Sequence, residues 1–95
     1  MNKRQIFPQK DFIHCAEILR ALAHPTRLMI VQALLKEKGC VRDLEKRLAK
    51  PQANISQHLA ILRKEGIIGF VEQGKSRCYY LKEVKDIKKI LSCVE

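Results

Sequence analysis

The spacing of apolar residues divides the chain into short helices and one pair of strands. Between residues 9 and 22, apolar side chains recur three or four positions apart, which predicts an amphipathic helix. They are Phe12, Ile13, Ala16, Leu19 and Leu22, with Ala23 just beyond. A second helix should begin at Pro25, because proline suits a first helical position, and should stop near Gly39. Its apolar residues are almost continuous, so we expect it to be the central buried helix.

Two further helices are predicted close together, over residues 41–49 and from Pro51 to Gly66. Their inward-facing residues are Val41, Leu44 and Leu48 in the first, and Ile55, Leu59 and Leu62 in the second. In the first of these helices, Asp43 and Arg47 are four positions apart and are expected to pair on the outer face. Two helices joined by so short a turn form a helix-turn-helix unit.

The rest of the chain predicts a hairpin followed by a last helix. Residues 67–71 and 77–81 are rich in β-branched and aromatic side chains, and the loop 72–76 between them contains Gly74. The last helix, over about 83–94, carries an apolar stripe that a small monomer has little core left to cover. The stripe consists of Val84, Ile87, Leu91 and Val94. The predicted fold is mainly α with a small β-hairpin, a winged helix-turn-helix of order ααααββα.

Polar side chains gather on the leading turns of the fourth helix, where such a fold enters the major groove of DNA. They are Gln52, Asn54, Ser56, Gln57 and His58. Amide side chains bond bidentately to adenine, and a serine hydroxyl reaches base edges or phosphates. Phosphate contacts are expected from Arg63 and Lys64 later in the helix. Lys75 and Arg77 on the wing are expected to reach the DNA backbone or the minor groove. Each residue alone has an ordinary alternative, such as a helix hydroxyl bonded to its own backbone, a surface histidine or a solvated cation.

Composition supports one small basic domain over residues 1–95. The chain has 95 residues and a net charge of +9, which favours a polyanionic partner over a merely lysine-rich surface. Residues 1–8 are expected to form a loose basic arm, and no apolar run is long enough for a signal peptide or a membrane span. We therefore expect a cytoplasmic protein that binds double-stranded DNA.

The cysteines and histidines match no enzyme or zinc-finger pattern. The four cysteines are widely spaced without a Cys-x-x-Cys pair, so free thiols are expected rather than a disulfide framework. The histidines show no His-Glu-x-x-His spacing, and the chain has neither a Gly-rich phosphate loop nor a Gly-x-Ser-x-Gly elbow. His14 beside Cys15 is a candidate ligand pair, with a surface histidine next to a half-buried cysteine as the alternative. The prediction is a binding protein and no enzyme.

Three motifs together resemble the ArsR/SmtB-type metal- and redox-responsive repressors, over about residues 12–93. Residues 19–28 (LRALAHPTRL) are similar to the family's junction between its first two helices. Residues 54–59 (NISQHL) are similar to its recognition helix, and Gly74-Lys75 followed by residues 79–81 (YYL) to its wing. The resemblance implies a winged-helix homodimer, joined through the first and last helices, that represses an operon at an inverted-repeat operator until a ligand binds.

The inducer is where the sequence departs from that family. Many arsenic and cadmium sensors carry Cys-Val-Cys-Asp-Leu at the start of helix three, whereas residues 40–44 here read CVRDL, with a cation at Arg42. The last helix has no histidine, so the zinc and nickel site of other members is absent. Cys15, Cys40 and Cys93 remain as candidate sensors of a soft metal(loid), a persulfide or an oxidant. Three alternatives stay open: cysteines that are small buried hydrophobes, a regulator with no inducer site of its own, and a protein-interaction adaptor.

Overall fold

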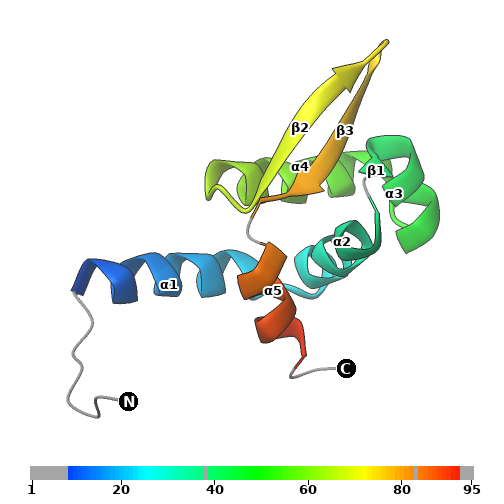
Figure 1. The fold of residues 1–95 in the computed structure, drawn as a ribbon. Coiled ribbons are helices and arrows are strands. Elements are labelled where there is room, and N and C mark those ends of the chain that lie inside the picture. Colours follow the sequence, from blue (N-terminus) through cyan, green and yellow to red (C-terminus); the bar gives the residue numbers. More distant parts are fainter. Residues whose placement is uncertain (1–8, 38, 83, 93–95) are drawn as a thin grey trace.

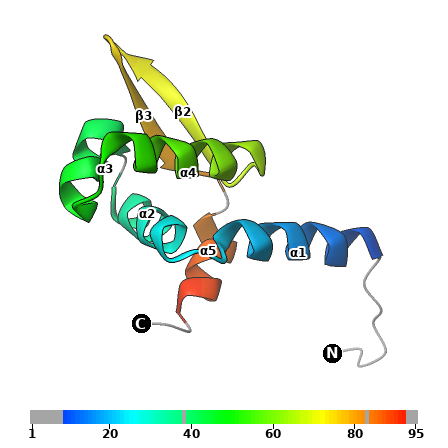
Figure 2. The same cartoon turned by 180° about the vertical axis from the view of Figure 1, so that it is seen from behind.

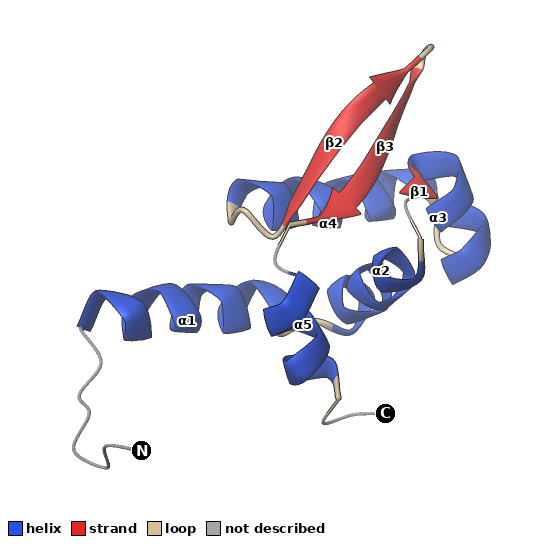
Figure 3. Cartoon of the chain, viewed as in Figure 1, coloured by secondary structure: helices blue, strands red, loops and turns tan. Residues whose placement is uncertain are grey.

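The computed structural model describes residues 9–37, 39–82 and 84–92. The predicted basic arm at 1–8, the candidate sensor Cys93 and the interface residue Val94 lie outside this part of the chain. The described elements follow the order α, α, β, α, α, β, β, α (Figures 1 and 3). They are α1 (Gln9–Leu22), α2 (Pro25–Lys36), β1 (Gly39–Cys40), α3 (Val41–Leu48), α4 (Gln52–Lys64), β2 (Ile68–Gln73), β3 (Ser76–Leu81) and α5 (Val84–Leu91). The five predicted helices and the hairpin are confirmed, and the fold is a winged helix-turn-helix.

The sheet contains one strand that the sequence did not predict. Its order is β1-β3-β2, all antiparallel, and β1 pairs with β3 through Gly39↔Tyr79 and Cys40↔Cys78. A two-residue strand is too short to show an alternating pattern, which is why the segment was expected to be only the end of a helix. β2 and β3 form the wing, with a two-residue turn in which Gly74 has φ 63°. β1 thus joins the wing to the helix-turn-helix.

The core lies between α2, α4, the base of the wing and α5. Its fully buried residues come from every one of these layers. They are Ile30, Val31, Leu44, Ile55, Leu59, Leu62, Ile67, Ile68 and Ile87. The expectation that α2 is central is confirmed, because α2 packs against α3, α4, β3 and α5. The core therefore fixes α4 and the wing relative to each other.

Among the α1 side chains that the structure describes, burial begins at Ile18. Ile18, Ala21 and Leu22 are buried, whereas the side chains of residues 12–17 are all exposed. Figure 2 shows this half of the helix reaching away from the body of the domain. The apolar stripe of the predicted amphipathic helix is therefore buried only in part: Leu22 is 2% exposed, whereas Ile13 and Leu19 are each 51% exposed. The helix α1 contacts α2 and α4, and its buried residues all lie toward its C-terminal end.

The last helix differs from its predicted role. Ile87 is fully buried and Leu91 is 4% exposed, because α5 packs on α2 and closes the core of the same protomer. Of the predicted interface stripe, only Val84 is exposed among the described residues, at 42%. The sequence pattern correctly identified an apolar face but assigned it to a partner rather than to the protomer's own core.

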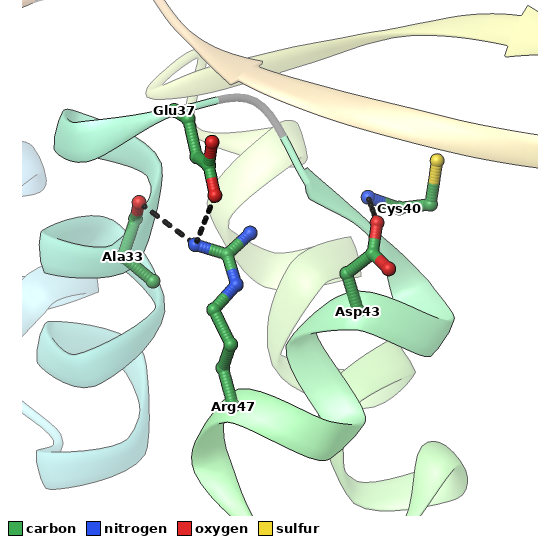
Figure 4. A network of polar contacts seen from close by, with 5 residues as sticks. All are labelled: Ala33, Glu37, Cys40, Asp43 and Arg47. Atoms are coloured by element: carbon green, nitrogen blue, oxygen red, sulfur yellow. Dashed lines mark hydrogen bonds and ion pairs between the residues drawn. The ribbon is translucent and has the colours of Figure 1, made fainter.

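Arg47 links α2 to α3. Its Nη1 donates to the Ala33 carbonyl oxygen at 3.3 Å and lies 3.9 Å from a Glu37 carboxylate oxygen (Figure 4). Asp43 instead accepts a hydrogen bond from the Cys40 backbone N–H at 3.4 Å, at the start of α3. The predicted Asp43–Arg47 pair is therefore wrong, because each side chain has a helix terminus within reach.

Candidate nucleic-acid interface

The fourth helix, α4, presents one polar face beside the wing. Its buried side carries Ile55, Leu59 and Leu62, and these residues hold the helix on the core. The helix begins with Pro51 as its N-cap, whose carbonyl accepts from the Ile55 N–H at 3.1 Å. No side chain caps its first N–H groups, so they remain available to an external acceptor.

Between α3, α4 and the wing lies a hollow of about 470 Å³, which we call the basic hollow. Its lining residues come from three separate segments of the chain. They are Val41, Arg42, Gln52, Ser56, Ala60, Arg63, Lys75, Ser76, Arg77 and Tyr79. Five of the predicted DNA-contacting residues are among them, so the fold brings recognition-helix and wing residues to one surface. Those five are Gln52, Ser56, Arg63, Lys75 and Arg77.

The basic hollow carries charge of one sign. Arg42, Arg63, Lys75 and Arg77 all line it and all are exposed, and none of its lining residues is acidic. Four cations facing one concave surface raise the local potential and attract a polyanion. Gln52 and Ser56 add neutral donors and acceptors in their midst. Cations with interspersed amide and hydroxyl groups suit a nucleic-acid backbone with accessible base edges.

Phe70 of β2 lies beneath two of these cations. The guanidinium carbon of Arg63 is 4.3 Å from the centroid of the Phe70 ring, and that of Arg77 is 4.4 Å from it. The ring also packs against Tyr79, with centroids 5.7 Å apart. A guanidinium stacked on an aromatic face loses part of its rotational freedom but keeps its N–H donors outward. Phe70 thereby couples the end of α4 to the wing.

Three other predicted residues are exposed outside this lining, namely Asn54, Gln57 and Lys64. With about 100° per residue in a helix, Gln57 lies about a quarter turn from Ser56. Asn54 lies nearly on the opposite side of the helix from Ser56. Gln57 and Lys64 therefore extend the polar face away from the wing, while Asn54 lies at the far margin of the helix.

His58 is not on the polar face. It is 8% exposed, and its ring packs against His24 with centroids 4.3 Å apart. His24 in turn caps α2, because its Nδ1 accepts from the Thr26 N–H at 3.1 Å. The prediction that His58 contacts DNA is therefore wrong: within the helical repeat it falls beside Ile55 and Leu59, on the buried side. Burial, followed by the positive charges of His24, Arg27 and Lys50, lowers the pKa of His58 below its ordinary value of 6.5.

The cysteines do not form the set that the sequence suggested. Cys40 and Cys78 are joined by a disulfide across β1 and β3, with Cα atoms 3.9 Å apart. The expectation of free thiols is therefore wrong for these two, because the unpredicted β1 strand places them opposite each other. Cys15 is an exposed free thiol on α1. Within the described ranges, no group of three or more His, Cys, Asp or Glu side chains is arranged to hold a metal ion.

Sequence reasoning missed two contributors to the surface. Arg42 was considered only for its effect on a metal site, yet it lines the basic hollow from the start of α3. Phe70 was taken as an ordinary strand residue, and its neighbours Gly69 and Val71 give no sequence signal for the two arginines that stack on it. In the part of the chain that the structure describes, no helix is long and apolar enough to cross a membrane.

Comparison with known proteins identifies close relatives. A family model described as bacterial regulatory protein, arsR family, matches residues 24–69. An HTH-type transcriptional regulator of Methanocaldococcus jannaschii is 45% identical over 80 residues, which cover 80% of this chain and 89% of that protein. The transcriptional repressor SmtB of Mycobacterium tuberculosis is 38% identical over 77 residues, which cover 80% of this chain and 57% of the repressor.

A solved structure of HlyU from Vibrio cholerae has the same fold. It superposes with a TM-score of 0.84 and 31% sequence identity, over 92% of this chain and 98% of that one. The HlyU of that organism is named a transcriptional activator.

Proposed function

The chain belongs to the ArsR family of bacterial regulatory proteins, and on that premise we propose that it is a dimeric repressor of transcription. It binds an inverted-repeat operator in double-stranded DNA and leaves it in response to a thiol-reactive or soft-metal(loid) signal. The observation that carries the proposal is the basic hollow, where α4 and the wing present Gln52 and Ser56 among four cations. Repression is chosen over activation because SmtB of Mycobacterium tuberculosis and the biofilm growth-associated repressor of Xylella fastidiosa, both similar to this chain, are named repressors.

The geometry supports α4 as the recognition helix. Its buried side is fully used by the core, and its outer side ends in the open N–H groups after Pro51. With α4 in the major groove, the wing lies beside it, and Lys75 at the turn and Arg77 on β3 meet the flanking backbone. A dimer related by two-fold symmetry then reads two half-sites about one helical turn apart.

The dimer is proposed to form chiefly through α1. The exposed apolar side chains of that helix are Phe12, Ile13 and Leu19, and its first half extends away from the protomer. Apolar side chains grouped on one projecting element mark an interaction surface. Val84 adds exposed apolar surface at the start of α5, so the first and last helices both contribute to the proposed interface.

The signal is proposed to act through sulfur. Thiolates bind soft ions and react with oxidants and persulfides. The described residues offer Cys15 as an exposed thiol and the Cys40–Cys78 pair beside the DNA-facing surface. A soft metalloid would compete with the disulfide for the same two sulfurs, and Cys93 remains a third candidate from the sequence.

The test begins with selection of duplexes from a random pool by the purified protein. Affinity for the selected duplex and for a scrambled one is then measured by fluorescence anisotropy across a range of salt. We expect an inverted repeat bound by two protomers, and a steep loss of affinity with salt as counterions are released. A flat salt response, or one protomer per duplex at saturation, contradicts the proposal.

A further inference from the structure

We propose that Cys40 and Cys78 form a reversible thiol–disulfide site whose bond holds the wing on the helix-turn-helix and strengthens operator binding. Reduction of this bond then weakens binding to DNA, so at this pair of cysteines the signal that releases the operator is a reductant and not an oxidant. The inference rests on the proposed function, because operator binding is its readout. It assigns the thiol chemistry to one pair of sulfurs, at the contact between β1 and β3.

The site is built by backbone pairing. Cys40 and Cys78 face each other in the β1–β3 ladder, in the register that also pairs Gly39 with Tyr79. Their Cα atoms are 3.9 Å apart, and the two sulfurs are bonded across the ladder. Cys40 is half-buried and Cys78 is 4% exposed. One sulfur is therefore open to a reagent while the other is sheltered.

The disulfide affects much of the DNA-binding surface because it closes a long segment of the chain into a ring. The two cysteines are 38 positions apart, and the closed ring contains α3, α4 and β2. Arg42 lies two residues after Cys40, and Arg77 immediately precedes Cys78. Both arginines line the basic hollow, one from the helix-turn-helix and one from the wing. A covalent tie at this joint therefore fixes the spacing between two cations that face the same DNA.

Without the bond, the connection at this joint is slight. β1 contains only Gly39 and Cys40, so its ladder with β3 spans two residue pairs. Short edge pairings of this kind open readily. The base of the wing stays packed on the core, but the contact between β1 and β3 is then held by these two residue pairs alone. Any opening of this contact that DNA has to close reduces affinity. Forming the disulfide restricts the chain before DNA binds, so the ordering of this contact no longer reduces affinity.

The reagent that opens the bond is a dithiol. One of its thiolates attacks the half-buried Cys40 sulfur, the S–S bond breaks, and Cys78 leaves as a thiolate that takes up a proton. The second thiol of the reagent then attacks the mixed disulfide and releases Cys40, while the reagent itself becomes a disulfide. Two electrons and two protons pass to the protein. A peroxide reverses the step, as two thiols and one peroxide yield the disulfide and two waters.

Gln73 provides a hydrogen-bond acceptor for the Cys78 thiol of the reduced form. The Cys78 sulfur lies 3.3 Å from the Gln73 Oε1, a separation suited to an S–H donor and an amide oxygen acceptor. The disulfide has no hydrogen to give, so this contact becomes a hydrogen bond only after reduction. A buried thiol with an acceptor already in place makes the dithiol form accessible without rearrangement.

The experiment compares the full-length protein oxidised with hydrogen peroxide and reduced with tris(2-carboxyethyl)phosphine. Binding to a selected inverted-repeat duplex is measured by anisotropy, and the Cys40–Cys78 link is mapped by peptide mass after alkylation of free thiols. We expect the oxidised form to bind about tenfold more tightly, which corresponds to a change of about 1.4 kcal/mol. Cys40→Ser should bind like reduced wild type under both conditions, and Cys15→Ser should respond like wild type.

A second variant tests the reduced state. Gln73→Leu removes the acceptor, so its dithiol form should reoxidise at a lower ratio of oxidant to reductant, and its melting temperature when oxidised should match that of wild type. Equal DNA affinity in both redox forms, or absence of the Cys40–Cys78 peptide after oxidation, overturns the inference alone. If neither form binds duplex DNA, the proposed function is wrong and the inference falls with it.

Discussion

His58 of α4 packs against His24 at the junction of α1 and α2, with ring centroids 4.3 Å apart. The His58 Nδ1 is buried without a hydrogen-bond partner, and so is the Nε of Arg27. Cationic groups from three segments act on His58: His24 from the junction, Arg27 from α2 and Lys50 from the turn before α4. The pair thus attaches α4 to the body of the domain through a site that tolerates a neutral ring and disfavours a charged one.

The first prediction is a loss of stability in mild acid. Burial and the neighbouring cations lower the pKa of His58 below 6.5, so the unfolded chain binds the proton more readily than the folded one. The stabilisation of the folded state is complete above pH 6.5 and is lost as the pH falls toward the lowered pKa. Thermal unfolding between about pH 5 and about pH 8 should show this decline. It should shrink in His58→Gln and persist in the exposed control His14→Gln; a decline of equal size in His58→Gln would refute the assignment.

The second prediction separates sequence recognition from charge. Gln57→Ala should lower discrimination between operator and random duplex by about 1–3 kcal/mol if the amide bonds a base bidentately. Lys75→Ala should weaken both duplexes alike and reduce the slope of affinity against salt by about one, because it removes one phosphate contact. Anisotropy titrations on both duplexes measure the two effects. A change of sequence preference in Lys75→Ala without one in Gln57→Ala would reverse the roles.

Gln52 and Asn54 allow a comparison within the same helix. Gln52 lines the basic hollow, whereas Asn54 is exposed nearly opposite Ser56. We therefore expect Gln52→Ala to weaken operator binding more than Asn54→Ala does. Both alanine variants remove a side-chain amide from an exposed position of the same helix. A difference in their DNA affinity therefore reports the position of the amide and not the loss of an amide as such.

The third prediction concerns Phe70. Phe70→Leu should weaken DNA binding by about 1 kcal/mol, because Arg63 and Arg77 lose the ring on which they stack. In a double-mutant cycle, the same change in an Arg63→Ala, Arg77→Ala background should have almost no further effect. Phe70→Tyr keeps the ring and should bind like wild type. Equal losses in both backgrounds would indicate that Phe70 acts only through stability.

The fourth prediction tests the dimer. Ile13→Asp together with Leu19→Asp should yield monomers, since two charges would be buried in the proposed interface. Sedimentation equilibrium gives the mass, and circular dichroism shows whether the fold survives. Met29→Asp, at an exposed apolar position on α2, is the matched control and should remain dimeric. A dimer that persists in the double variant would exclude α1 as the main interface.

The fifth prediction concerns the joint between α2 and α3. A Cβ added at Gly39 would lie 2.5 Å from the Arg47 Nη2, so Gly39→Ala should displace the guanidinium from the Ala33 carbonyl. The expected loss is about 0.5–1.5 kcal/mol, the net value of one hydrogen bond. Arg47→Ala should cost a similar amount. Denaturant unfolding of the double variant should show less than the sum, because both changes remove the same contact.

The helices were predictable because their signals are local. Pro25 begins α2 as its ring chemistry predicts, and the period of Ile55, Leu59 and Leu62 correctly gave the buried side of α4. The same period, applied to all five polar residues of that helix, would have excluded His58, which lies on the buried side. A cluster in sequence was thus mistaken for a cluster in space.

Features that depend on distant pairing were beyond sequence reasoning. β1 exists because Gly39 and Cys40 meet β3, some forty positions away, and nothing in a two-residue segment announces that partner. The disulfide and the stacking of Phe70 follow from the same sheet. For α1 and α5, the apolar periodicity identified an apolar face of each helix, but it did not show whether that face packs on the core of the same protomer. Ile87 of α5 is buried in that core, whereas Ile13 of α1 is exposed.

In the proposed dimer, the folding of the projecting half of α1 depends on the concentration of the protein. Residues 12–17 lie outside the core, and a helix of so few turns is marginal in water by itself. If a second copy covers this segment, dilution below the dimer dissociation constant will unwind it, and the entropy of ordering it becomes part of the association free energy. Occupancy of the operator then rises more steeply than in proportion to protein concentration. In the proposed dimer, the length of this one helix would set the protein concentration above which operator occupancy rises steeply.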